Sequence, residues 1–164
     1  MDALIDWLVS TRLSWFVTTF RWVWPISESL HFCGLTVLAG TVGLFDLRLL
    51  GLVKGVAPIT LHHQLRWGMV GFAVSVITGV MFISGMPDQY FYNDAFKLKV
   101  VFLVLMGLNA ALFYWLELGR VRQLGPHDDA TLSVKIIAAA SLFLLVAVIL
   151  CGRMITFFRP PPYY

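Results

Sequence analysis

Long apolar runs, separated by short polar breaks, organise this sequence. The runs cover residues 26–53, 60–84, 94–118 and 130–158, with approximate ends. A helix needs about 20 apolar residues to cross the hydrocarbon core of a bilayer, and each run meets that length. The breaks contain Pro58, Pro87 and Pro126, and proline is typical of helix ends and turns. The pattern predicts an all-α fold, a bundle of four transmembrane helices.

Residues 1–24, before the first run, follow a different pattern, in which tryptophan, phenylalanine and leucine mix with charged side chains. The charged residues there are Asp2, Asp6, Arg12 and Arg21. Tryptophan-rich amphipathic segments lie well at the boundary between water and lipid, because the indole ring is partly apolar and partly polar. Ser10 and Thr11 indicate a break with a fresh N-cap. The sequence therefore predicts an N-terminal amphipathic interfacial helical segment, a pair of helices, and Pro25 suits the first turn of the next helix.

The composition assigns nearly the whole chain to the membrane. Of its 164 residues, 59% are hydrophobic and 13% charged, and the mean hydropathy of +0.82 lies far outside the range of a soluble domain. We therefore expect a single membrane domain over residues 1–164. The net charge is +3, but lysine and arginine are scattered instead of forming a basic run. The expected partner is thus the lipid bilayer and not a nucleic acid.

The ends of the chain and its cysteines carry further expectations. Asp2 and Asp6 stand where a signal peptide would be positive, so we expect the N-terminus to remain in the mature protein. Cys33 and Cys151 fall inside predicted spans without a metal-ligand spacing, and we interpret them as packing residues. Four spans place both termini on one side. Loop-borne lysine and arginine favour the opposite side as cytoplasmic, which predicts a multi-pass inner (plasma) membrane protein with both termini periplasmic.

Ionisable residues near one end of the spans form the candidate site. Because successive spans run antiparallel, the starts of the first and third lie level with the ends of the second and fourth. This places Glu28, His31, Lys97, Lys99 and Arg153 at one depth, here called the outer layer. Glu28 and His31 are three residues apart and share a helix face. Each ionisable group costs about 2.5–3.5 kcal/mol at mid-membrane, so the grouping needs a structural or functional reason.

Several interpretations of the outer layer stay open. The charges could neutralise one another and lock helix packing. The layer could bind haem b, with His31 as the iron ligand, the basic residues as partners of the propionates, and Met81 or Met86 as a second ligand unless the iron is five-coordinate. A quinone head group bonded to His31 and Lys99 fits as well, and so does a proton relay through Glu28 and His31. A metal ion that is not part of haem is disfavoured, because the layer has few metal-ligating side chains and its lysine and arginine residues would repel the ion.

A second polar set lies toward the other end of the spans. It comprises Asp46, Arg48, His62, His63, Arg66, Glu117 and His127. Most of these side chains can reach cytoplasmic water, so we interpret the set as a solvated rim.

Two further features concern helix packing. Gly71, Ser75 and Gly79 recur every fourth residue and let a neighbouring helix approach closely, while Asn109 is placed for an interhelical hydrogen bond.

No catalytic chemistry follows from this sequence. It contains no nucleophile–base arrangement, Gly-rich phosphate loop or HExxH motif, so no catalytic residue is named. We expect a non-catalytic subunit or accessory protein of a larger membrane complex, such as a redox complex, in contact with other membrane subunits or with copies of itself. The alternative is a membrane electron carrier that binds haem b or a quinone around His31.

Five short motifs resemble a family of small bacterial four-helix membrane proteins described as a domain of unknown function. They are ESLH at 28–31, FDLRLLG at 45–51, NDAFKLK at 93–99, GLNA at 107–110 and CGRMI at 151–155. The likeness spans nearly the whole chain. The resemblance implies recurring polar positions at Glu28, His31, Asp46, Arg48, Asn93, Lys99, Asn109 and Arg153. The resemblance implies no recurring role for His62, His63 and His127, and it implies no established activity.

Overall fold

The computed structural model describes residues 2–158, which form helices joined by turns and loops, without a strand. Its four long helices are α3 (Val23–Leu49), α4 (Pro58–Gly85), a third helix composed of α6 (Asp94–Leu112), the π-helical turn η1 (Phe113–Glu117) and α7 (Leu118–Val121), and α8 (Leu132–Met154). Each is long and apolar enough to cross a membrane. The predicted all-α class with four candidate spans is confirmed, and these helices indicate a location in a membrane.

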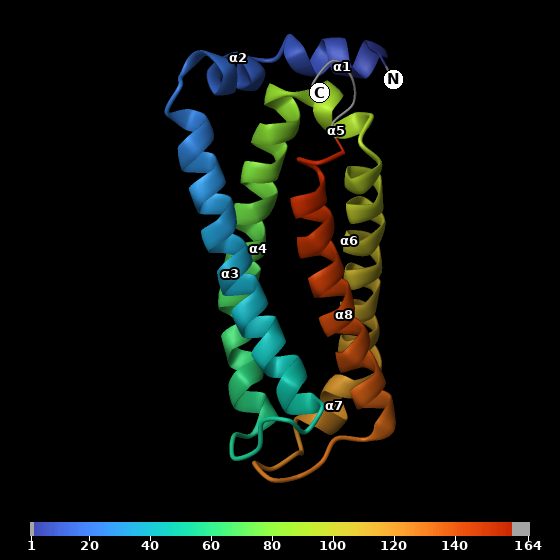
Figure 1. Cartoon of the computed structure of the whole chain (residues 1–164). Coiled ribbons are helices and arrows are strands. Elements are labelled where there is room, and N and C mark those ends of the chain that lie inside the picture. Colours follow the sequence, from blue (N-terminus) through green and yellow to red (C-terminus); the bar gives the residue numbers. More distant parts are fainter. Residues whose placement is uncertain (1, 159–164) are drawn as a thin grey trace.

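Figure 1 shows the long helices side by side, with α3 beside α4 and α6 beside α8. The most extensive packing joins α3 to α4, and α6 packs next most extensively on α8. Contacts between α3 and α8 connect the two pairs. A cluster of buried apolar residues fills the bundle toward the α3–α4 and α7–α8 connections. Its members are Phe45, Leu49, Leu61, Phe113, Val121, Ala130, Val134 and Ala138.

Two short helices, α1 (Asp2–Val9) and α2 (Arg12–Thr19), lie across one end of the bundle, as expected of an interfacial pair (Figure 1). The predicted cap between them is present, since the Thr11 hydroxyl accepts a hydrogen bond from the Ser14 backbone N–H at 3.2 Å. The Tyr92 hydroxyl, after α5 (Pro87–Phe91), donates to Asp2 Oδ1 at 2.7 Å. This hydrogen bond raises the pKa of Tyr92 and ties α1 to the bundle.

Helix ends differ from the predicted runs by a few residues, for local reasons. α3 stops at Leu49, before the predicted end at 53, because Gly51 adopts a φ of 87°, which ends the helix. The third helix continues to Val121 through η1. α8 ends at Met154, and the chain turns between there and 158.

Glycine brings α3 and α4 together near the middle of the bundle. A Cβ atom built on Gly71 would lie 2.5 Å from the Gly34 carbonyl oxygen, and one built on Gly34 would lie 2.6 Å from the Gly71 carbonyl oxygen. No side chain fits in that space. Of the predicted small-residue stripe, Gly71 and Ser75 are buried in this contact and Gly79 is half-buried.

Candidate functional site

His31 is the outer-layer residue that contacts a neighbouring helix most closely. Its Nδ1 lies 2.8 Å from the Thr78 hydroxyl oxygen on α4. That hydroxyl also lies 2.8 Å from the Val74 carbonyl oxygen, and when it donates there it can accept a hydrogen bond from His31. In the tautomer with the proton on Nδ1, Nε2 keeps the free lone pair that a metal ligand or proton acceptor needs. The imidazole packs edge-on against Phe82, with ring centroids 5.5 Å apart.

Among the outer-layer cations, Lys99 is the one whose charge influences His31. It is half-buried between α6 and α8, and its Nζ lies 3.5 Å from the position of a Cβ built on Gly152. Its charge acts on His31 on α3. The structure thus brings His31 and Lys99 within electrostatic reach of each other.

The other outer-layer residues point elsewhere. Lys97 pairs with Asp94 at 2.8 Å, and the Arg153 guanidinium lies over the Phe157 ring at 5.2 Å. Glu28 is exposed and makes no hydrogen bond or ion pair with any residue from 2 to 158. Mutual neutralisation of the layer by ion pairs is therefore wrong for the described part of the chain.

The two proposed sulfur ligands have surroundings of their own. Met81 lies one turn from Thr78, but its sulfur accepts a hydrogen bond from the Ser27 hydroxyl at 3.6 Å. Met86 is exposed at the end of α4. Across the described residues no group of three histidine, cysteine or acidic side chains could hold a metal ion. His31 therefore belongs to no such group.

Asn93 joins two helices and caps one of them. Its Oδ1 accepts hydrogen bonds from the backbone N–H groups of Ala95 and Phe96, which makes it the N-cap of α6. Its Nδ2 also donates to the carbonyl oxygens of Ile155 at 2.9 Å and Phe158 at 2.7 Å. Asn93 therefore joins the start of α6 to the end of α8.

The interpretation of the second polar set as a solvated rim is wrong for its three most buried members. Asp46, Arg48 and Glu117 expose 4%, 0% and 3% of their surface. Glu117 pairs with the exposed Arg120 at 3.2 Å. His62 is half-buried between the rings of Phe45 and Tyr114, at centroid distances of 6.0 and 5.8 Å. The remaining members, His63, Arg66 and His127, are exposed as expected.

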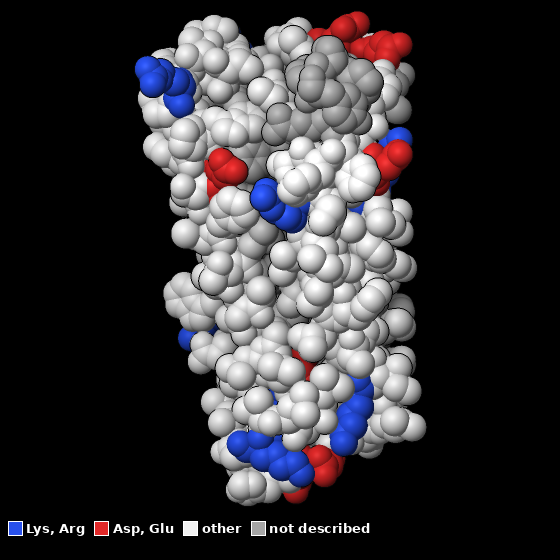
Figure 2. Space-filling model, viewed as in Figure 1, with Lys and Arg blue, Asp and Glu red and all other residues white. Residues whose placement is uncertain are grey.

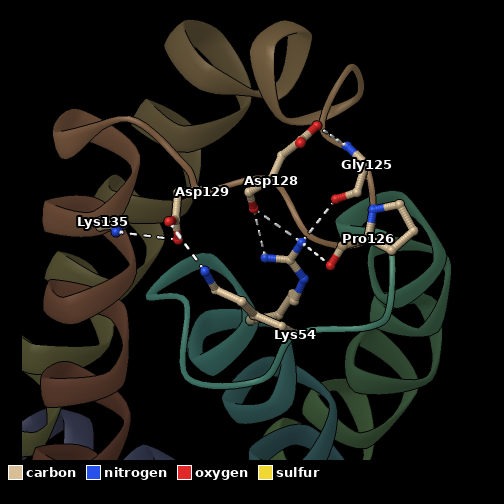
Figure 3. A network of polar contacts seen from close by, with 7 residues as sticks. Lys54, Gly125, Pro126, Asp128, Asp129 and Lys135 are labelled. Atoms are coloured by element: carbon tan, nitrogen blue, oxygen red, sulfur yellow. Dashed lines mark hydrogen bonds and ion pairs between the residues drawn. The ribbon is translucent and has the colours of Figure 1, made fainter.

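Arg48 holds two loops together through backbone carbonyl groups. Its Nε donates to the Val56 oxygen at 2.6 Å, and Nη2 donates to the Gly125 and Pro126 oxygens at 2.9 and 2.8 Å. The Asp128 carbonyl oxygen accepts from both Nη1 and Nη2 at 3.3 Å. Figure 3 shows the loop residues Gly125, Pro126 and Asp128 at this junction. The hydrogen-bond donors of the guanidinium are thus satisfied by carbonyl groups of two loops. One loop joins α3 to α4, and the other joins α7 to α8, so Arg48 connects all four long helices.

Charged side chains reinforce the same junction from its surface. Asp129 pairs with Lys54 at 3.2 Å and with Lys135 at 3.7 Å (Figure 3). The hydrogen bond and charge of Lys54, together with the charge of Lys135, lower the pKa of Asp129 below its ordinary value. The Asp128 carboxylate accepts from the Gly125 backbone N–H at 2.7 Å.

Acid should weaken this junction through Asp129. The pKa of Asp129 is lower in the folded protein than in the unfolded chain, where it has the ordinary value of about 3.9. The ionised carboxylate therefore stabilises the fold above about pH 3.9, and this stabilisation is lost as the pH falls through the lowered pKa of the folded state. We expect Asp129→Asn to reduce the thermal midpoint slightly at pH 7, as exposed ion pairs do, and not at pH 2. Thermal unfolding in detergent at both pH values measures this. An equal difference between the two proteins at both pH values would contradict the role of the carboxylate.

These features define an integral-membrane protein class: a four-span helical bundle with an interfacial N-terminal pair and a buried arginine that joins its loops. A family model described as "Family of unknown function (DUF6644)" matches residues 4–158, and the chain belongs to that family. The resemblance to an uncharacterised family is therefore confirmed. Neither the curated proteins nor the solved structures gave a match.

Proposed function

We propose that this protein is a non-catalytic subunit or accessory protein of a larger membrane complex. The exposed face of α6 carries the proposal. α6 contributes none of its 19 residues to the buried interior of the bundle. Gly107 opens onto empty space, and Ala111, four residues on, is exposed on the same face. Small residues at this spacing let a second transmembrane helix approach closely.

Lipid alone gives no reason for a glycine at this position. Leucine and valine satisfy acyl chains equally well, and much of the exposed α6 surface is built from them, as at Leu98, Val101 and Val104. Within this chain the glycines Gly34 and Gly71 receive a neighbouring helix. A partner helix seated at Gly107 would use the same principle, and the partner we propose is a helix of another membrane protein.

Basic residues support a location in the bacterial inner membrane with both termini periplasmic. Figure 2 shows lysine and arginine gathered at the end of the bundle opposite α1 and α2. That end holds Lys54, Arg120 and Arg122, on the connections or beside them. Under the positive-inside rule it faces the cytoplasm.

Substitutions on α6 test the proposed contact. We expect protein carrying Gly107→Leu and Ala111→Leu to lose about tenfold or more of a membrane protein that co-purifies with the wild type in native lipid discs, with its own thermal midpoint unchanged. The reason is that leucine closes the space a partner helix would occupy. Ala139→Leu, an exposed change on α8, is the matched control and should keep the partner.

Three outcomes would contradict this function. The wild type could run as a lone monomer, the partner could survive the paired leucines, or Ala139→Leu could remove it equally. A homodimer that the paired leucines dissociate would replace the proposed subunit with a second copy of this chain. The mass of the particle in the lipid disc distinguishes these cases.

One observation favours a second candidate, an electron carrier that binds haem b or a quinone around His31. The contact of His31 Nδ1 with the Thr78 hydroxyl fits the tautomer that leaves the Nε2 lone pair for iron or for a quinol hydroxyl, with the Lys99 charge nearby. The same purified protein provides the test. This candidate requires a Soret band or an extractable quinone that His31→Ala removes, and a colourless, quinone-free protein would contradict it.

A further inference from the structure

A cavity of about 130 Å³ lies between α3, α4, the third helix and α8, well away from His31. Its wall is mostly apolar, with Leu38, Phe113 and Ala138 among its residues. Its few polar residues are Asp46, Asn109, Tyr114 and Ser141. A mostly apolar wall with a few polar side chains is typical of a small-molecule site, and the volume limits the occupant to about one ring.

Asp46 supplies an unsatisfied group to this cavity. Its side chain is 4% exposed, and its Oδ2 is buried without a hydrogen-bond partner among the described residues. Ser141 lies on the same cavity wall and acts electrostatically on the carboxyl group. Arg48 is two positions away, but its donors are directed to loop carbonyl groups. A buried polar atom without a partner in the membrane is costly, and it indicates a group that the bound state supplies.

The third helix is distorted where it borders the cavity. It becomes a π-helix over Phe113–Glu117, and both Phe113 and Tyr114 line the cavity. Single π-helical turns occur frequently at functional sites. One turn before, Asn109 Nδ2 donates to the Ile137 carbonyl oxygen at 3.1 Å, which orients the amide between the third helix and α8.

The cavity reaches the outer surface of the bundle between α4 and the third helix. Three of its lining residues are exposed: Met69 by 66%, Tyr114 by 50%, and Ala110. Met69 and Ala110 lie near the middle of their helices, so the opening faces the acyl chains of the bilayer. A molecule dissolved in lipid can enter there without crossing water.

We propose that the cavity binds a neutral, ring-sized, lipid-dissolved molecule with a hydroxyl group, a phenol or hydroquinone head group, whose hydroxyl hydrogen-bonds Asp46 Oδ2. The volume suits one six-membered ring, as a dry apolar cavity of about 150 Å³ accepts benzene. The lateral entrance disfavours an ion, because a charge must be desolvated to pass through acyl chains. A hydroxyl both donates and accepts, and it thus satisfies a carboxyl group in either protonation state. The proposal does not rest on a partner helix at Gly107, but the entrance at Ala110 lies on the same face of the third helix, since Ala110 is three positions after Gly107.

Fluorine NMR with the full-length protein in lipid discs tests this site, using 4-fluorophenol and fluorobenzene as matched probes. Empty discs correct for partition into lipid. We expect saturable binding of 4-fluorophenol that is roughly tenfold tighter than that of fluorobenzene, because only the phenol has a hydroxyl for Asp46. Asp46→Leu, which keeps the branched shape but has no hydrogen-bonding atom, should equalise the two probes. Ala110→Phe, which narrows the entrance, should weaken both.

A control acid and a charged probe complete the test. Asp88→Asn, an exposed change on α5, should leave both affinities as in the wild type. Equal wild-type binding of the two fluorinated probes, or no saturable binding, would overturn the proposal. So would tighter binding of 4-fluorobenzylammonium, which would mark a cation site. The wild-type comparison of probes stands even if Asp46→Leu fails to fold.

Discussion

Replacing Arg48 with alanine is expected to lower the free energy of unfolding by about 3 kcal/mol or more. The side chain is fully buried and donates to four carbonyl groups in two loops, at Val56, Gly125, Pro126 and Asp128. Each hydrogen bond from a charged donor contributes about 1.5–3 kcal/mol, and part of the loss is recovered where water reaches the loops. Equilibrium unfolding in mixed micelles with increasing sodium dodecyl sulfate measures the change.

Two further variants separate charge from geometry at this position. Arg48→Lys keeps the charge but loses the planar fork of donors, so it should recover only part of the stability. Arg66→Ala removes an exposed arginine from the same end of the bundle and should change the free energy of unfolding by less than about 0.5 kcal/mol. Equal losses for the alanine variants at Arg48 and Arg66 would contradict the structural role of the buried guanidinium.

The second large effect is expected at Gly71. Gly71→Ala should reduce the free energy of unfolding by about 1–3 kcal/mol, because a methyl group there would lie 2.5 Å from the Gly34 carbonyl oxygen and force α3 and α4 apart. The same separation should lengthen the contact between His31 and Thr78. Unfolding in mixed micelles gives the stability change.

The matched control for this substitution lies on α6. Gly107→Ala adds the same methyl group where nothing lies within 4 Å, and alanine has the higher helix propensity. We expect the stability of this variant to equal or slightly exceed that of the wild type. A destabilisation at Gly107 as large as at Gly71 would show that the effect belongs to the backbone and not to the close approach of helices.

Sequence alone determined the four long helices of this protein and its N-terminal pair, with ends a few residues off. Hydropathy over about 20 residues reports the length of a span directly, since each helix satisfies its own backbone. The caps at Thr11 and Asn93 were predictable for the same reason, because a cap bonds N–H groups two or three residues away. The polar character of Asp46, Arg48 and Asn109 within apolar runs was also visible, and it marked them as residues that need partners.

Only the tertiary structure decided what those partners are. Arg48 binds carbonyl groups 77 and 80 positions away, and hydropathy does not distinguish an arginine at a helix end that meets water from one that meets loops. The contact of His31 with Thr78 depends on the close approach of α3 to α4, and the Asp46 cavity depends on four helices and a π-helical turn. These contacts form between segments that are distant in the sequence. They depend on how the helices pack, because packing decides which side chains and carbonyl groups come within hydrogen-bond distance.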